Sequence, residues 1–115
     1  MKLPGRKSDK THPAYRRAKA QEKETASRLG GKQTLASGSK AEKGDVRVSG
    51  VLRLECKCTS RKSYSLKRED LRKIANAATG GEVPALEIEF LGEDGKVEMA
   101  VAVVPRYVLE QLCQS

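Results

Sequence analysis

The amino-acid sequence contains few aromatic residues: one Phe, three Tyr and no Trp among 115 residues. Proteins that bind single-stranded nucleic acid without sequence preference stack the bases on aromatic rings, so the composition argues against such a platform. The hydrophobic core must be built from Val, Leu, Ile and Ala instead. No apolar run approaches the roughly 18 residues that a membrane-spanning helix needs, and we expect no membrane partner.

Cysteine and histidine are also scarce, with three Cys and one His. An odd number of cysteines without an N-terminal secretory signal predicts free thiols in a cytoplasmic compartment, either prokaryotic or that of a virus-infected host. The spacing of Cys56, Cys58 and Cys113 with His12 is poor for a zinc site. Cys56 and Cys58 are better explained as buried residues on the apolar face of one strand.

Charged residues are plentiful but unevenly distributed, and the formal net charge is +8. Residues 1–73 contain 21 Lys and Arg against 8 Asp and Glu, whereas residues 74–115 contain 2 against 7. The first two-thirds of the chain is therefore predicted to form an electropositive surface that binds nucleic acid through its backbone and shape. A basic face without any partner is the alternative.

The apolar pattern predicts a disordered basic arm at residues 1–12 and a single domain over residues 13–115. Helical and strand periodicities, together with Gly and Pro positions, define the expected elements. They are a helix over 13–29, strands over 45–48 and 51–59, a helix over 67–79, strands over 83–92 and 96–104, and a short helix over 105–112. This order favours an α/β fold in which helices flank a mixed β-sheet.

The first predicted helix has a weak apolar stripe, formed by Tyr15, Ala18, Ala26 and Leu29. Glu22 falls within this stripe, whereas Arg17, Glu24 and Arg28 lie on the polar side. A carboxylate on a packing face is costly unless a cationic group meets it. Either Glu22 faces inward for a functional reason, or the helix is rotated slightly from this assignment.

The strand "LRLECKCTS" at residues 52–60 carries the candidate chemistry. Glu55 and Lys57 are two residues apart, so their side chains project from the same face of the strand. With Asp45 at the start of the preceding strand, Glu55 forms an oxygen-rich pair of the kind that Mg²⁺ prefers. Opposite charges also alternate on ordinary surface strands, which is the structural alternative for this triplet.

The residues "GD" before "LECKCTS" give the segment a resemblance to the core of the PD-(D/E)-x-K nucleases, whose fold is restriction-endonuclease-like. Over residues 15–81 the chain resembles the archaeal-type Holliday junction resolvases more closely, through "EKETASRL" at 22–29, "ASGSK" at 36–40 and "KSYSLKRED" at 62–70. The resemblance implies a Mg²⁺-dependent endonuclease, with Mn²⁺ as a substitute ion, that resolves four-way DNA junctions into nicks with 5′-phosphates.

Five positions match catalytic residues of that family, and they are Glu22, Ser37, Asp45, Glu55 and Lys57. The resemblance implies that Asp45, Glu55 and the backbone carbonyl of Cys56 bind the metal. Glu22 would assist, either directly or through a water molecule. This interpretation also accounts for a carboxylate on the packing face of the first helix.

The chain departs from the family pattern in two respects. Gly44 replaces the usual proline before the aspartate, and the interval from Asp45 to Glu55 is short. A two-residue turn at Ser49-Gly50 would place Asp45 opposite Leu54 and on the wrong face. The site therefore requires a turn with an odd number of residues, such as 49–51 with Gly50 in a left-handed conformation, or a kink at Asp45.

We expect branched DNA and a second copy of the chain as partners. The predicted DNA-binding residues are Lys40, Lys43, Arg61, Lys62, Tyr64, Lys67 and Arg68. A two-fold dimer would present two identical sites to the two strands of a junction. The apolar residues expected at its interface are Val83, Leu86, Ile88, Phe90, Val101 and Val103, with burial inside the monomer as the alternative.

Two other functions remain open on the sequence alone. The chain could be another PD-(D/E)-x-K endonuclease or nickase, acting in repair or in a mobile element. It could also be a basic DNA-binding module without catalysis. Cleavage of a four-way junction compared with linear duplex distinguishes the first of these, and metal-dependent cleavage distinguishes the second.

Overall fold

The computed structural model describes the backbone of residues 13–34 and 45–114, and the side chains of residues 16–34 and 46–114. The predicted arm at residues 1–12 lies outside these ranges. The elements are α1 (Pro13–Leu29), β1 (Lys32–Gln33), β2 (Asp45–Val48), β3 (Leu52–Thr59), α2 (Arg68–Ala77), β4 (Val83–Leu91), β5 (Val97–Val103) and α3 (Arg106–Gln114). The sequence predicts all of them except the two-residue strand β1.

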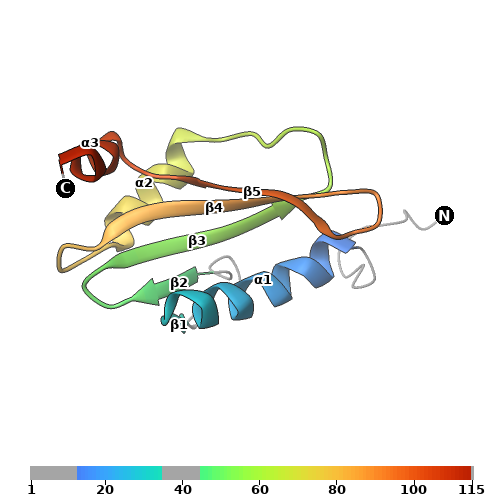
Figure 1. Ribbon diagram of the computed structural model, residues 1–115, viewed down its shortest axis with the longest axis horizontal. Helices are drawn as coiled ribbons and strands as arrows, with labels where there is room; N and C mark the ends of the chain where they lie inside the picture. The colour runs from blue at the N-terminus through green and yellow to red at the C-terminus, as the bar shows by residue number, and fades with distance from the viewer. Residues whose placement is uncertain (1–12, 35–44, 115) are drawn as a thin grey trace.

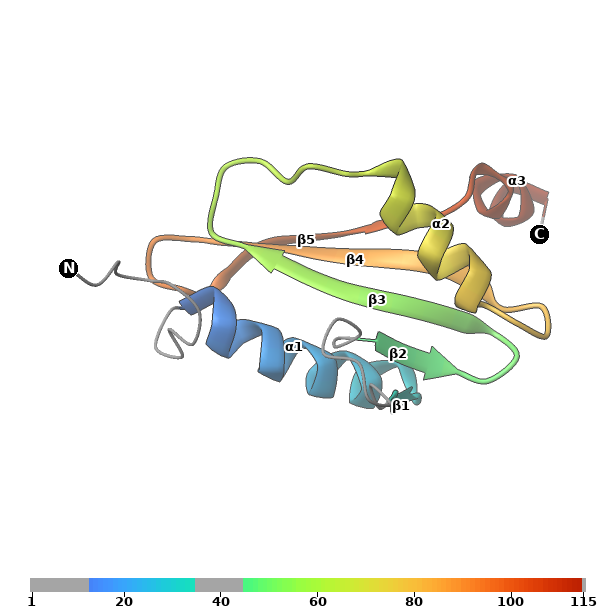
Figure 2. The ribbon, with the colours of Figure 1, turned by 180° about the vertical axis from the view of Figure 1, so that it is seen from behind.

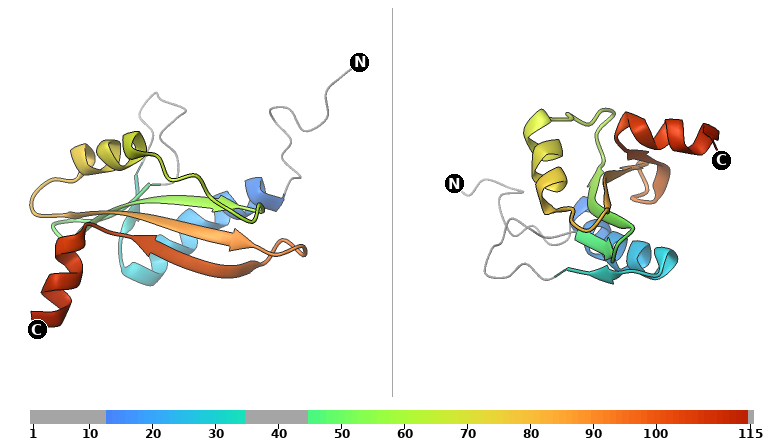
Figure 3. Two further views of the ribbon diagram at one scale, coloured as in Figure 1. Left: turned by 90° about the horizontal axis from the view of Figure 1, so that it is seen from above. Right: turned by 90° about the vertical axis from the view of Figure 1, so that its left-hand side faces the viewer.

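The strands form one five-stranded sheet in the order β1-β2-β3-β4-β5 (Figure 1). Neighbouring strands are antiparallel except β3 and β4, which are parallel and are joined through α2. Figure 2 shows α2 running beside β3 and β4. The views in Figure 3 place α1 and α2 on opposite faces of the sheet. The expected α/β architecture with a mixed sheet is confirmed.

The central strand β3 separates two chemically different faces. Leu54 and Cys56 are buried in a hydrophobic cluster on the α1 side, together with Ala26, Val46 and Ala85. Because successive residues of a strand point to opposite faces, Glu55 and Lys57 lie on the α2 side. Their partners across β4, Leu86 and Ile88, are buried on that same face.

The packing face of α1 differs from the predicted apolar stripe. Gln21 and Thr25 are fully buried, whereas Leu29 is 40% exposed. The helix is therefore rotated so that polar side chains meet the sheet. These buried polar side chains have a partner in the sheet, because Glu87 of β4 accepts hydrogen bonds from both of them. The predicted orientation of the helix is therefore wrong.

None of the helices in residues 13–34 and 45–114 is long and apolar enough to cross a bilayer.

Candidate functional site

The turn between β2 and β3 determines which residues share a face. It contains three residues, 49–51, and is closed by a hydrogen bond from the Val51 amide to the Val48 carbonyl at 2.8 Å. Gly50 has a φ of 77°, in the left-handed region that glycine tolerates. The resulting register pairs Asp45 with Glu55. Directly opposed positions of an antiparallel pair share a face, so the geometric condition set by the sequence is met.

A buried carboxylate holds this turn in place. Glu82 accepts hydrogen bonds from Arg47 Nε at 2.6 Å, from the Thr79 amide at 3.0 Å and from the Gly50 amide at 3.2 Å. The Thr79 amide, the Arg47 guanidinium and the Gly50 amide together lower the pKa of Glu82 to about 2. The Glu82 carboxylate thus links the β2–β3 turn to the segment between α2 and β4.

Glu55 and Lys57 form an ion pair on the α2 face. Lys57 Nζ lies 2.9 Å from Glu55 Oε2, and both side chains are partly buried. Burial alone lowers the pKa of the Lys57 ammonium, but the hydrogen bond and negative charge of Glu55 outweigh this effect and the pKa is raised. Lys57 is therefore a cation at neutral pH, able to donate hydrogen bonds to an anionic oxygen or to a water molecule.

Two further groups lie close enough to this pair to act on its electrostatics. Burial raises the pKa of the Tyr64 hydroxyl, and the charges of Lys57, Asp70 and Glu55 act on the same group. Tyr64 was predicted as a DNA contact. Asp70 was not predicted, although it stands in the first turn of α2, where acidic residues are favoured by the helix dipole. The acidic first turn "RED" is the only sequence signal that could have drawn attention to it.

The reverse side of the same strand is fixed by polar contacts from α1. Gln21 Nε2 donates to the backbone carbonyl of Lys57 and to Glu87 Oε1, both at 3.1 Å. Glu87 also accepts hydrogen bonds from Thr25 Oγ1 and Arg28, both at 2.8 Å. The helix therefore contacts the Glu55–Lys57 segment from behind, through its backbone rather than its side chains.

Two arginines of α1, Arg17 and Arg28, pair with carboxylates of β4, and the predicted place of Arg17 on the polar side of the helix is wrong. Arg17 Nε lies 2.6 Å from Glu89 Oε1, and Arg28 lies 2.8 Å from Glu87 Oε2. Glu24 and Arg28 keep exposed positions, with side chains 55% and 54% exposed, and Glu24 contacts Arg17 at 2.7 Å. The sequence of α1 alone does not reveal this because its partners are on β4.

Glu22 lies apart from the Glu55–Lys57 pair in the described contacts. Its carboxylate accepts a hydrogen bond from Gln33 Nε2 of β1 at 3.4 Å. α1 covers the face opposite to Glu55 and Lys57, and among the described contacts none joins Glu22 to either residue. The remaining predicted positions Ser37, Lys40, Lys43 and the side chain of Asp45 lie outside the described residues.

The other predicted ligands and contacts occupy ordinary positions. Cys56 is buried, and desolvation raises the pKa of its thiol, as do the charges of Glu87 and Glu22. All three cysteines are free. Among the described side chains, which exclude that of Asp45, no group of three or more His, Cys, Asp or Glu could hold a metal. The predicted DNA contacts Arg61, Lys62, Lys67 and Arg68 are exposed.

Comparisons of the chain with protein-family models, with curated proteins and with solved structures give no match. The resemblance to a nuclease family therefore depends on the motifs quoted above and on their geometry.

Proposed function

We propose that the chain is a Mg²⁺-dependent, structure-selective DNA endonuclease that resolves four-way junctions. The observation that carries this proposal is the register of the β2–β3 hairpin. It pairs Asp45 with Glu55 and leaves the Glu55–Lys57 ion pair on one face of the sheet. This register is the one that the metal site requires, because a shift of one residue would put Asp45 on the other face.

The donor set suits a hard divalent cation. Glu55 is partly buried, carries oxygen donors and is held beside a cationic group, and position 45 supplies a second carboxylate directly across the hairpin. In the proposal Asp45, Glu55 and the Cys56 carbonyl hold Mg²⁺ or Mn²⁺. Ser37 is assigned by resemblance alone, and so is Glu22, whose helix covers the opposite face of the sheet. A bound divalent ion would activate a water molecule and neutralise negative charge on the phosphate.

Lys57 supplies the second part of the chemistry. Its ammonium is held by Glu55 and is close to Tyr64, so it can hold a phosphate oxygen or orient the attacking water. Exposed basic side chains then extend from this site along the β3–α2 segment, and they are Arg61, Lys62, Lys67 and Arg68. In the proposal these residues contact DNA phosphates on either side of the reacting one.

The proposed enzyme acts as a homodimer, because a junction requires two symmetrically placed nicks. Leu86 and Ile88 are buried within the chain and are removed from the expected interface. The exposed apolar residues of β5 and α3 include Val101, Tyr107, Leu109 and Leu112, and we call these four the β5–α3 surface. Since α3 buries none of its residues in the chain, this surface is suited to a second copy.

The test compares a labelled four-way junction with a linear duplex of the same arm sequence. In Mg²⁺ we expect paired nicks in the junction and little cleavage of the duplex. Equal cleavage of both would support another PD-(D/E)-x-K endonuclease or nickase. Binding of both without cleavage would support a non-catalytic DNA-binding module.

The Glu55→Gln variant is the control that assigns the activity to this site. The amide keeps the size of the side chain but removes the charge that pairs with Lys57 and binds the cation. Cleavage should be lost while junction binding remains, because affinity derives mainly from many phosphate contacts. The free thiols of Cys56, Cys58 and Cys113 fit the reducing cytoplasm in which we place this activity.

A further inference from the structure

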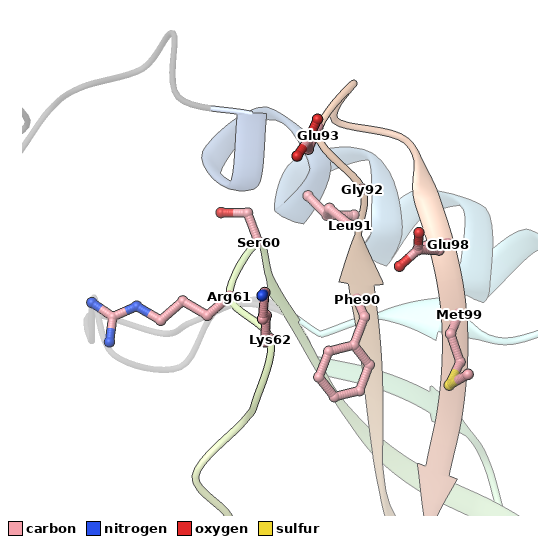
Figure 4. A pocket seen from close by; sticks show the side chains of 9 residues that line it. All are labelled: Ser60, Arg61, Lys62, Phe90, Leu91, Gly92, Glu93, Glu98 and Met99. Atoms are coloured by element: carbon pink, nitrogen blue, oxygen red, sulfur yellow. The ribbon is translucent and has the colours of Figure 1, made fainter.

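A cavity of about 750 Å³ opens beyond Lys57, further along β3, and its apolar lining is not used by the proposed chemistry (Figure 4). It lies at the carboxyl ends of the parallel strands β3 and β4, where ligands of α/β sheets commonly bind. Thr59 pairs with Phe90 at this end, two residues beyond the pairing of Lys57 with Ile88. The lining residues are Ser60, Arg61, Lys62, Phe90, Leu91, Gly92, Glu93, Glu98 and Met99.

The cavity has an apolar floor and two charged walls. The Phe90 ring and the Met99 side chain come from paired positions of β4 and β5, and they lie side by side in Figure 4. Lys62 and Arg61 form the wall on the β3–α2 segment, with Arg61 extending outward from the mouth. Glu93 and Glu98 lie on the hairpin side.

Phe90 is the only phenylalanine of the chain, and Met99 is 59% exposed beside it. An apolar floor that remains open to solvent is available to a flat apolar ligand. In the described part of the chain, the structure records no ion pair for Lys62, Glu93 or Glu98, although the walls carry opposite charges. The two walls present cationic and anionic side chains to the same space.

A nucleotide matches each of these three features. Its phosphate suits Lys62 and Arg61, and the flat face of its base suits Phe90, since base–aromatic stacking is independent of sequence. Carboxylates accept hydrogen bonds from the exocyclic amino groups of cytosine, adenine and guanine, which thymine lacks. A purely apolar ligand would leave both walls desolvated without a partner.

We infer that this cavity receives one unstacked nucleotide of the DNA, next to the cleaved phosphate, and prefers a base with an exocyclic amino group. The inference deepens the proposed nuclease function and depends on it. Taking a base out of the stack costs least where regular pairing is disturbed, and in this inference the protein opens the junction at its branch point. The cavity would thus favour branched over linear DNA.

The experiment measures binding of a four-way junction in Ca²⁺ while an abasic site is moved through the nucleotides around the cleavage position. For the wild-type protein, one position should weaken binding about tenfold when its base is absent. For Phe90→Ala, binding should already be weaker and the same abasic site should have no further effect. A scan with no sensitive position in the wild type would overturn the inference.

A second pair of variants keeps the test valid if Phe90→Ala does not fold. Two junctions are compared, one with cytosine and one with thymine at the sensitive position. After replacement of the exposed Glu93 and Glu98 by Gln, the affinities for these two junctions should be nearly equal. The wild type should favour cytosine at the sensitive position several-fold, and Glu110→Gln on α3 should behave as the wild type. Equal affinity of the wild type for both bases would contradict the assigned preference.

The outcomes also separate this inference from the proposed function. A chain that neither binds nor cleaves junctions overturns both. A chain that cleaves junctions but shows no base dependence overturns the cavity assignment alone.

Discussion

At the scale of single residues, each buried carboxylate in the acidic part of the chain is matched by an arginine from the basic part. Glu82 contacts Arg47 at 2.6 Å, and the corresponding pairs of Glu87 and Glu89 involve Arg28 and Arg17 of α1. Part of the positive surplus of residues 1–73 is thus used inside the fold. In the proposal, the exposed basic residues of the β3–α2 segment contact DNA.

Glu82 gives a prediction for the pH dependence of stability. The pKa of Glu82 is about 2 in the folded chain against an ordinary value of 4.5. A carboxyl group whose pKa is lowered by folding stabilises the fold above its unfolded pKa. This contribution is lost as the pH falls from about 4.5 through about 2.

We therefore expect Glu82→Gln to be less stable than the wild type at pH 7, with a difference that shrinks as the pH falls towards 2. Urea unfolding midpoints over this range measure the effect. Glu110→Gln, at an exposed position of α3, should follow the wild type at every pH. A difference between Glu82→Gln and the wild type that is independent of pH would contradict the assigned role of the carboxylate.

At the scale of elements, the β2–β3 hairpin depends on the backbone conformation of one glycine. A Cβ at Gly50 would meet nothing within 4 Å, so substitution costs only the strain of its positive φ. Gly50→Ala should destabilise the fold by about 1–2 kcal/mol. Gly50→Asn should cost less because Asn adopts this conformation more readily. Unfolding midpoints that are equal for all three proteins would exclude a left-handed turn.

The contact of α1 with β4 gives a second prediction at this scale. Glu87→Ala removes the common acceptor of Gln21, Thr25 and Arg28 and leaves buried donors without partners. The free energy of unfolding should fall by about 2–3 kcal/mol. Glu24→Ala removes only an exposed pair and should leave the urea midpoint nearly unchanged. Equal effects of the two variants would contradict a structural role for the buried network.

The sequence predicts the elements well because strand alternation and helix periodicity are local signals. The alternation in β3 placed Glu55 and Lys57 on the face opposite to Cys56 and Cys58 without further information. The orientation of α1 could not be predicted in the same way, because its packing face is polar and is explained only by Glu87 and Glu89 on a distant strand. The two residues of β1 are too few to form a pattern.

The candidate site was predictable only in part, because some of its contacts join segments that are distant in the sequence. The condition on the β2–β3 turn follows from counting residues, since a shift of one residue reverses the faces. The approach of Asp70 and Tyr64 to the ion pair depends on how α2 returns over the sheet. No spacing in the sequence encodes that distance, and the cavity at Phe90 is formed by three separate segments.

At the scale of the whole molecule, the β5–α3 surface gives a prediction of assembly. Leu109 and Leu112 are 58% and 68% exposed on a helix that buries none of its residues. Replacing both by Glu should convert a dimer into a monomer, as measured by light scattering. It should also replace paired nicks by single ones.

Mixed dimers provide the functional counterpart of this test. Wild-type chains mixed with Glu55→Gln chains on a cruciform plasmid should give nicked circles where the wild type gives linear molecules. A monomeric mass for the wild type would refute the dimer. So would linear product that falls only in proportion to the fraction of wild-type chains.

The most direct test of the proposed site is cleavage of a labelled mobile junction, with the metal ion and the two central residues varied in one gel. The wild type should cut in Mg²⁺ and bind without cutting in Ca²⁺. Glu55→Gln and Lys57→Ala should bind and lose at least about 10²-fold in rate. Lys19→Ala, at an exposed position of α1, should cut normally. Undiminished cleavage by Glu55→Gln, or cleavage without a divalent ion, would contradict the account.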